Sequence, residues 1–240
     1  MFAHFDVKPS DMRAFAIASV LLFLPHAHAQ FVYPKPEYNK SVAGTYQEDP
    51  FIVTYRRKFF AVFRGDFKTF ETAYAEINTM LEKNPKDARA LVWLGNGQTV
   101  KAGLLRVQGK QAEAEALLET SRETLDSAVK LKPKDPNIYM MRAATLYIQG
   151  QYWPADKLPR RVWETLRDDC NTFIKFIGPT RMPKVSTHVR GEAYGELGIA
   201  YKNLGDTKKA VETFKKLIQL NPDTDYAKRA EDELRKLKKS

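Results

Sequence analysis

Cys170 and His188 are the two side chains of this sequence best suited to nucleophilic chemistry. Cys170 is the only cysteine, and a cysteine beside a histidine can act as an activated nucleophile. Its neighbours at helical spacing are all apolar: Val162, Leu166, Phe173 and Ile177. A thiol on such a face is expected to be a packing residue. His188 follows a loop and is predicted to be a surface residue at a helix start, so the pair does not predict catalysis.

Carboxylates are the second candidate for chemistry. Glu164, Asp168 and Asp169 lie close together in the sequence, and paired carboxylates can act as general acid and base. Adjacent residues on a helix point apart, however, and Arg160, Arg161 and Arg167 are nearby, which favours a solvated acidic face. A metal site needs several His or Cys ligands at defined spacing, and only one histidine follows residue 29. We predict no catalytic residue, no metal site and no cofactor.

The elements that must position these residues are clearest in residues 194–222, which read YGELGIAYKNLGDTKKAVETFKKLIQLNP. The apolar residues recur at the spacing of two helices joined by a turn. Gly198 is expected to lie close to the paired helix. Gly205 would supply the left-handed cap of the first helix, and Asp206 would cap the start of the second. Pro222 ends the second helix.

This segment resembles a tetratricopeptide repeat, a helix-turn-helix unit of about 34 residues that stacks on copies of itself. The matching positions are Leu197, Gly198, Ala200, Tyr201, Gly205, Asp206, Ala210, Phe214, Leu217 and Pro222. Such a unit cannot bury its apolar face alone, so neighbouring repeats are expected. We predict an all-α fold, a right-handed α-solenoid of about four such repeats that ends in a capping helix.

Weaker copies of the pattern set the expected organisation after residue 50. The repeats are expected at about residues 51–86, 87–134, 135–179 and 188–224, and the capping helix at 225–238. Trp153-Pro154 interrupts the third repeat, because proline breaks the hydrogen bonding of a helix. Segment 153–183 is therefore the most irregular part of the predicted solenoid.

The second repeat has two possible registers. Leu94-Gly95 repeats the spacing of Leu197-Gly198, and Gly97 offers a rival register two residues later. This repeat is also longer than the last one, and the extra residues are best placed by lengthening both helices around Gly109.

The chain begins with a segment that is typical of export. From Met12, one positive residue precedes a short apolar run, and Ala27-His28-Ala29 matches a signal-peptide cleavage site. Residues 1–29 are expected to be a cleaved signal peptide, and 30–50 an extended arm. The apolar run is too short to span a bilayer. The mature chain is therefore expected to be periplasmic or secreted, without a transmembrane segment.

The resemblance is to exported bacterial tetratricopeptide-repeat proteins, and it implies binding in a concave groove lined by the first helices of the repeats. The groove positions transferred to this chain are Arg89, Asn96, Thr99, Met140, Ala144, Tyr147, Glu192, Ile199, Lys202 and Asn203. Some members clamp a partner's terminal carboxylate with Lys and Asn. Here Val92 stands four residues before Asn96, where the Lys would be, so the clamp is not expected.

Three functional hypotheses follow from these patterns. The leading one is a non-enzymatic scaffold or adaptor in the cell envelope that binds a peptide or protein in the groove. A net charge of +10 is also compatible with an accessory factor that binds anionic envelope polymers. Nucleic acid is disfavoured as a partner by the export signal. The third hypothesis is a cryptic hydrolase that uses the Asp and Glu residues of the third repeat.

Overall fold

The computed structural model describes residues 49–153 and 157–239, and every regular element within these ranges is a helix. The elements are α2 (Pro50–Phe59), η2 (Phe60–Arg64, a 3₁₀ helix), α3 (Phe67–Lys83), α4 (Ala88–Val107), α5 (Gln111–Leu131), α6 (Pro136–Tyr152), α7 (Arg160–Ile177), η4 (Met182–Lys184, also 3₁₀), α8 (Thr187–Asn203), α9 (Thr207–Leu220) and α10 (Asp225–Leu237). The predicted signal peptide at 1–29 and nearly all of the predicted arm at 30–50 lie outside the described residues.

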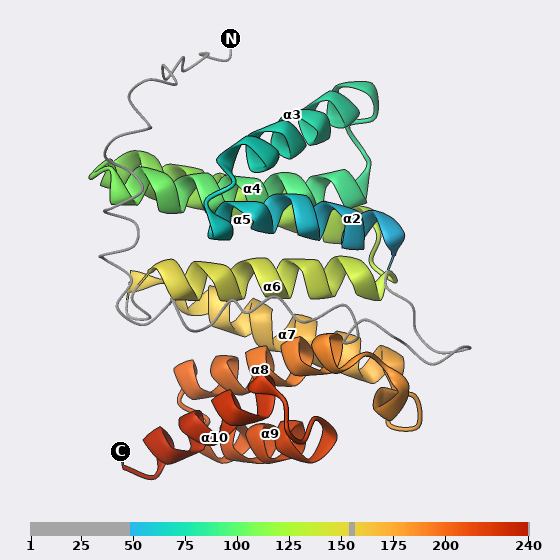
Figure 1. Cartoon of the computed structure of the whole chain (residues 1–240), viewed down its shortest axis with the longest axis vertical. Coiled ribbons are helices and arrows are strands. Elements are labelled where there is room, and N and C mark those ends of the chain that lie inside the picture. The colour runs from blue at the N-terminus through green and yellow to red at the C-terminus, as the bar shows by residue number, and fades with distance from the viewer. Residues whose placement is uncertain (1–48, 154–156, 240) are drawn as a thin grey trace.

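The helices stack as successive hairpins from α3 at one end to α10 at the other (Figure 1). Helices α2 and α3 form the first hairpin, α4 and α5 the second, α6 and α7 the third, and α8 and α9 the fourth. Helix α10 packs on α9 and α8. The predicted all-α repeat solenoid is thereby confirmed. Helices α4 and α5 contain 20 and 21 residues and meet at Gly109, as the spacing of the second repeat predicted.

Aspartate caps and left-handed glycines define the helix ends. Aspartate side chains accept a backbone N–H in the first turn of five helices, through Asp49, Asp66, Asp87, Asp135 and Asp206. Gly65 and Gly205 adopt φ values of 81° and 84°, which a residue without a Cβ tolerates best. The predicted roles of Gly205 and Asp206 are confirmed, and Gly65-Asp66 repeats them in the first hairpin.

Close helix contacts explain the glycines inside the helices. A Cβ on Gly198 would lie 2.3 Å from Cε1 of Phe214, and a Cβ on Gly95 would lie 2.6 Å from Cγ of Leu125. The two glycines therefore hold equivalent positions in α8–α9 and α4–α5, which supports the register of Leu94-Gly95 over that of Gly97. Gly97 makes a different contact, because its Cβ would lie 2.4 Å from Cδ2 of Tyr74 on α3.

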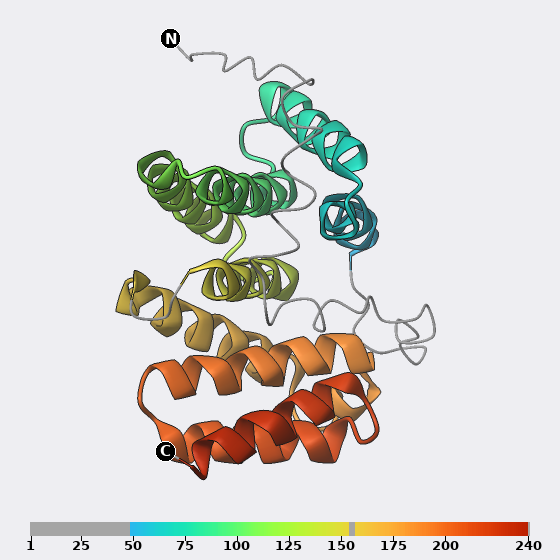
Figure 2. The same ribbon diagram turned by 60° about the vertical axis from the view of Figure 1, so that its left-hand side comes forward.

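Helix α2 lies on the side of α4 opposite α5 (Figure 2). The rings of Tyr55 and Phe59 pack against the indole of Trp93 on α4, with centroid separations of 6.4 and 4.9 Å. Phe59 and Trp93 are fully buried. This aromatic contact fixes the position of α2. Residues of α2 thereby face residues of α6 and α8, the first helices of the third and fourth hairpins.

Candidate binding site on the concave face

A hollow lies between α2, α6 and α8. Its lining combines apolar side chains with one cation, one amide and one carboxylate, namely Ile52, Arg56, Phe60, Asn137, Met140, Met141, Ala144, Val189 and Glu192. Ile52, Arg56 and Phe60 recur every four residues, so one face of α2 and η2 forms one wall. The first helices of the third and fourth hairpins form the opposite wall. A mostly apolar concavity with a few polar groups is the usual form of a binding site.

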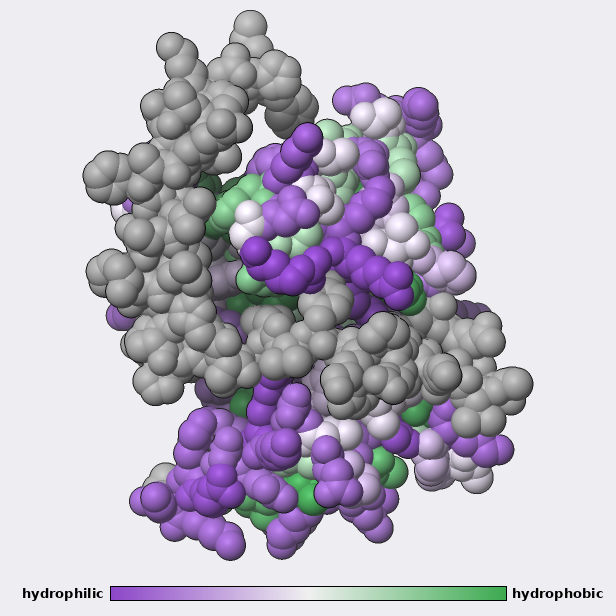
Figure 3. Space-filling model, viewed as in Figure 1, coloured by the Kyte–Doolittle hydropathy of each residue, from purple (hydrophilic) through white to green (hydrophobic). Residues whose placement is uncertain are grey.

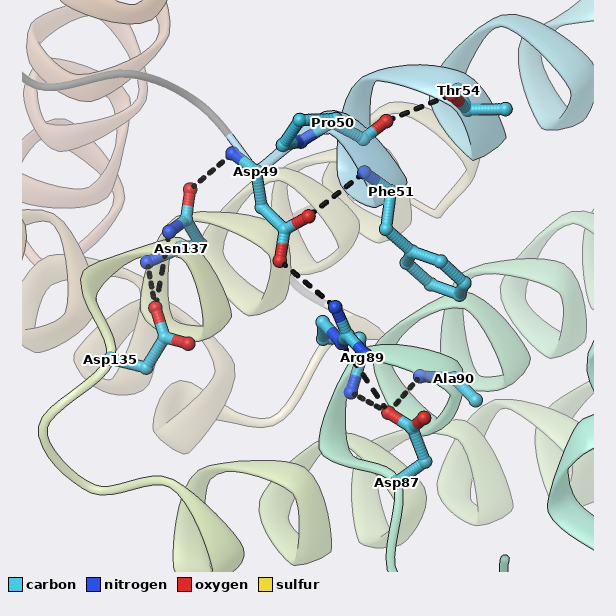
Figure 4. Close-up of polar contacts among 9 residues, drawn as sticks. All are labelled: Asp49, Pro50, Phe51, Thr54, Asp87, Arg89, Ala90, Asp135 and Asn137. Atoms are coloured by element: carbon cyan, nitrogen blue, oxygen red, sulfur yellow. Dashed lines mark hydrogen bonds and ion pairs between the residues drawn. The ribbon is translucent and has the colours of Figure 1, made fainter.

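Polar contacts fix the end of α2 at the edge of this hollow (Figure 4). The Asp49 backbone N–H donates to Oδ1 of Asn137 over 3.4 Å, and its carboxylate lies 3.6 Å from Nη1 of Arg89. The same carboxylate accepts the Phe51 N–H over 2.8 Å and so caps α2. Asp49 therefore ties the start of α2 to both α4 and α6.

A row of ionisable side chains runs along α8, with His188, Glu192 and Glu196 one turn apart. His188 Nε2 lies 3.2 Å from Oε1 of Glu192. Glu196 is 5% exposed, and its Oε2 has no hydrogen-bond partner among the described residues. Burial raises the pKa of both glutamates, while Arg56 acts in the opposite direction on each. The pKa of Glu196 lies well above its ordinary value, because the Glu192 charge adds to the effect of burial.

Helix α10 completes this row through Tyr226. The Tyr226 hydroxyl lies 2.6 Å from Nδ1 of His188 and forms a hydrogen bond with it. Gly191 makes room for the ring, since a Cβ there would lie 2.3 Å from Cγ of Tyr226. Burial raises the pKa of Tyr226, and on α6 it raises the pKa of Tyr147 to about 12, with the Glu196 charge contributing. Both phenols are thus neutral at physiological pH.

Three of the predicted groove residues line the hollow: Met140, Ala144 and Glu192. Asn96 and Thr99 are instead completely buried, so the prediction that they face the groove is corrected. Asn96 Nδ2 donates to Oγ1 of Thr145 over 3.2 Å, and Thr99 lies 2.8 Å from the Ser121 hydroxyl. These contacts place them in a polar layer between α4, α5 and α6, where neighbouring helices cover the face that the repeat pattern assigned to the groove.

The other predicted groove residues are not part of the lining of the hollow. Arg89 is half-exposed at the start of α4 and interacts with Asp49. Tyr147 lies near the row on α8. Ile199 packs among partly buried apolar residues of the last two hairpins. Lys202 pairs with Glu233 of α10 over 2.5 Å, and Asn203 Nδ2 donates to the Ile199 carbonyl over 2.9 Å.

The residues considered for catalysis have structural partners. Cys170 is fully buried, as predicted, and burial raises the pKa of its thiol. Glu164 and Asp168 pair with arginines of their own helix, in agreement with the predicted solvated face. Asp169 does not belong to that face, because it is 1% exposed and accepts two hydrogen bonds of 2.7 Å from Arg142. Burial raises its pKa to about 6 despite this partner.

His188 also requires a correction, because it is buried and not on the surface. It starts α8 as predicted, but Tyr226 and Glu192 enclose its ring. The sequence carried a signal for this arrangement: residues four positions before and after Glu192 share its face of the helix. Arg56 was missed for a different reason, since the position of α2 in front of α6 and α8 depends on contacts between distant segments.

A family model for the tetratricopeptide repeat matches residues 191–224, which cover most of α8, all of α9 and the turn before α10. The chain therefore contains a tetratricopeptide repeat within an all-α solenoid. Such repeats generally mediate protein–protein interaction and are typically non-enzymatic. The comparison with curated proteins finds no significant match.

Residues 49–153 and 157–239 also lack two other kinds of feature. Within these ranges no helix is both long and apolar enough to cross a bilayer. The same ranges contain no group of three or more His, Cys, Asp or Glu side chains that could hold a metal ion.

Proposed function

We propose that this protein is a non-enzymatic scaffold or adaptor that holds a peptide or protein segment in the hollow between α2, α6 and α8. The observation that carries the proposal is the lining of this hollow, where first-helix residues Met140, Ala144 and Glu192 face Arg56 of α2. Apolar positions beside isolated polar groups suit an extended segment that presents both kinds of side chain. The tetratricopeptide repeat supports a protein partner.

We also propose that the protein acts in the cell envelope after export. The support comes from the sequence between Met12 and Ala29, which has the charge, apolar run and small residues of a cleaved signal peptide. Fractionation of cells that express the full chain, with N-terminal sequencing of the product, tests this part. Cleavage before Gln30 and recovery outside the cytoplasm are expected. An uncleaved product in the cytoplasm would contradict it.

Site-specific photocrosslinking tests the binding site. A photoreactive amino acid replaces Ala144, which lines the hollow, and in a matched control it replaces Lys175, which is exposed on α7. Irradiation in an envelope extract is expected to give a discrete protein adduct from position 144 and not from position 175. Circular dichroism confirms that each variant stays folded. Equal adducts from both positions, or none from either, would refute binding in the hollow.

The basic surface supports a second candidate function, the binding of anionic envelope polymers. The end of the solenoid formed by α9 and α10 is strongly hydrophilic (Figure 3) and carries exposed lysines such as Lys208, Lys215 and Lys216. Binding through these lysines would weaken steeply with salt, because exposed charges are screened. The crosslinking experiment is therefore repeated at high salt. Capture of polyanionic material alone, lost at high salt, would favour this second function.

A further inference from the structure

The described chain begins at the edge of the hollow between α2, α6 and α8. The Asp49 backbone N–H donates to Oδ1 of Asn137, which lines the hollow, and the Asp49 carboxylate lies 3.6 Å from Nη1 of Arg89 (Figure 4). These contacts fix the point from which the preceding chain departs. Residues 30–48 remain there after the expected cleavage, so the mature chain carries a segment tethered at this edge.

The hollow is narrow and accepts only short side chains. Ile52, Met140 and Val189 line it from three different helices, yet they are only 2%, 7% and 3% exposed. A long side chain such as lysine or arginine does not fit between these walls. The occupant that suits them is a segment of small residues.

A run of small residues precedes α2 at a short distance. Residues 41–45 read Ser-Val-Ala-Gly-Thr, and none of them is charged. Neither Arg56 nor Glu192 of the lining therefore repels this run. Its hydroxyl groups can also donate hydrogen bonds to a carboxylate, which accepts only.

The tether is long enough for this run to reach the whole hollow. Asn137 and Ala144 of the lining lie about two turns apart on α6, or about 10 Å. Thr45 stands four residues before Asp49, and four extended residues span about 13 Å. A segment tethered by a short linker also has an effective concentration of about millimolar, so that few contacts suffice to hold it.

We propose that residues 41–45 lie across the hollow in the absence of a partner, and that a partner must displace them. The inference rests on the proposed function only in taking this hollow as the binding site. It gives the segment before α2 an autoinhibitory role, because the site is available only when the run has left it.

Photocrosslinking within the purified protein tests the inference. The full chain is expressed and processed by the cell, and the photoreactive residue at position 144 is then irradiated without any extract. The matched control again carries the photoreactive residue at position 175. An adduct within one molecule, mapped to residues 41–45 by mass spectrometry, is expected from position 144 and not from position 175.

Two further variants test whether small side chains are required. Ala43→Arg places a long side chain in the run and is expected to abolish the internal adduct. Tyr38→Arg introduces the same side chain and charge outside the run and is expected to retain it. If the run occupies the hollow in about nine molecules of ten, Ala43→Arg also raises partner capture from envelope extract by about tenfold. Circular dichroism checks the fold of both variants.

The outcomes separate this inference from the proposed function. A partner adduct in extract without an internal adduct in the purified protein would refute the inference and leave the proposed function standing. An internal adduct without a partner adduct, even from Ala43→Arg, would support the inference and refute the proposed function. An internal adduct that survives Ala43→Arg, or an adduct that joins two copies of the chain, would also overturn the inference. If neither kind of adduct forms at position 144, both fail.

Discussion

Burial of a carboxylate disfavours its ionised form, and Glu196 is buried with its Oε2 lacking a hydrogen-bond donor among the described residues. Ionisation of Glu196 also opposes that of Glu192 one turn away. The two residues therefore behave as a pair whose protons are held more tightly in the folded chain than in the unfolded one.

The first prediction concerns stability against pH. Because the folded pKa of Glu196 is raised, the folded state binds more protons, and the free energy of unfolding must fall as pH rises from the unfolded value towards the folded one. Glu196→Gln removes part of this fall, so its stability relative to wild type is expected to increase from pH 5 to pH 8. Urea unfolding at each pH measures it.

The control for this pH series is Glu212→Gln, which neutralises an exposed glutamate on α9 and should leave the pH dependence almost unchanged. If Glu196→Gln lost stability with pH as steeply as wild type, Glu196 would not be the group that titrates. Glu192 would then be examined by the same substitution.

The second prediction compares two neighbouring aspartates on α7. Asp169→Asn removes the buried carboxylate that accepts two hydrogen bonds from Arg142, while the exposed carboxylate of Asp126 still pairs with Nη1 of Arg142. The expected loss of stability is therefore at or below the roughly 3–5 kcal/mol that is typical for breaking a buried ion pair. Asp168→Asn alters an exposed residue and is expected to change stability by less than about 0.5 kcal/mol. Chemical denaturation of both variants measures the difference. Similar losses in the two would show that the α6–α7 contact does not depend on this ion pair.

At the scale of the helix, glycine positions decide how closely two helices can pack. On α8 the backbone approaches α9 at Gly198, where Phe214 leaves no room for a methyl group. Gly195 lies on the same helix, yet a Cβ there would meet only Cδ2 of Leu217 at 3.6 Å, an ordinary contact. Gly198, which belongs to the repeat motif, is therefore required for close packing, whereas Gly195 is not.

The third prediction follows from this contrast. Gly198→Ala is expected to destabilise the protein by about 1–3 kcal/mol, because the buried Phe214 ring must move. Gly195→Ala is expected to stabilise it by up to about 1 kcal/mol, because alanine has the higher helix propensity. Thermal unfolding followed by circular dichroism compares them. Destabilisation of equal size in both would mean that helix α8 has no tolerance for a methyl group on either side.

Local rules explain why the hairpins were predictable and the hollow was only partly so. The caps at Gly205 and Asp206 and the contact of Gly198 depend on residues within one repeat, and the sequence pattern records them directly. The burial of Asn96 and Thr99 depends on Thr145 and Ser121 of other helices. No short pattern specifies contacts over such separations, so Asn96 and Thr99 were wrongly assigned to the groove.

At the scale of the whole molecule, α10 closes the apolar end of the solenoid. It packs on α9 and α8 and covers the cluster that contains Ala210, Phe214 and Leu217. Its own outer face is charged, with Glu231, Asp232 and Lys236 exposed. A helix with one apolar and one charged face suits this position, because a repeat cannot bury its apolar face alone.

The fourth prediction is that loss of α10 destabilises the array. Ending the chain at Pro222 uncovers Phe214 and Leu217 and removes Tyr226 from His188. A fall in Tm of roughly 10 °C is expected, since about 1 kcal/mol corresponds to about 2–4 °C in a domain of this size. Removal of residues 238–240 alone serves as the control and should have little effect. An unchanged Tm after loss of the whole helix would show that α8 and α9 need no cover.

The dual attachment of α2 has a mechanical consequence. Its aromatic residues are fixed to Trp93 of the second hairpin, while Ile52 and Arg56 form a wall opposite the third and fourth hairpins. The width of the hollow is therefore set by the curvature of the solenoid. Bending that brings the later hairpins towards α2 narrows the hollow, and straightening widens it. An occupant of the hollow would therefore resist further bending of the array. A force that straightens the array would widen the hollow and loosen the contacts of α2, α6 and α8 with that occupant.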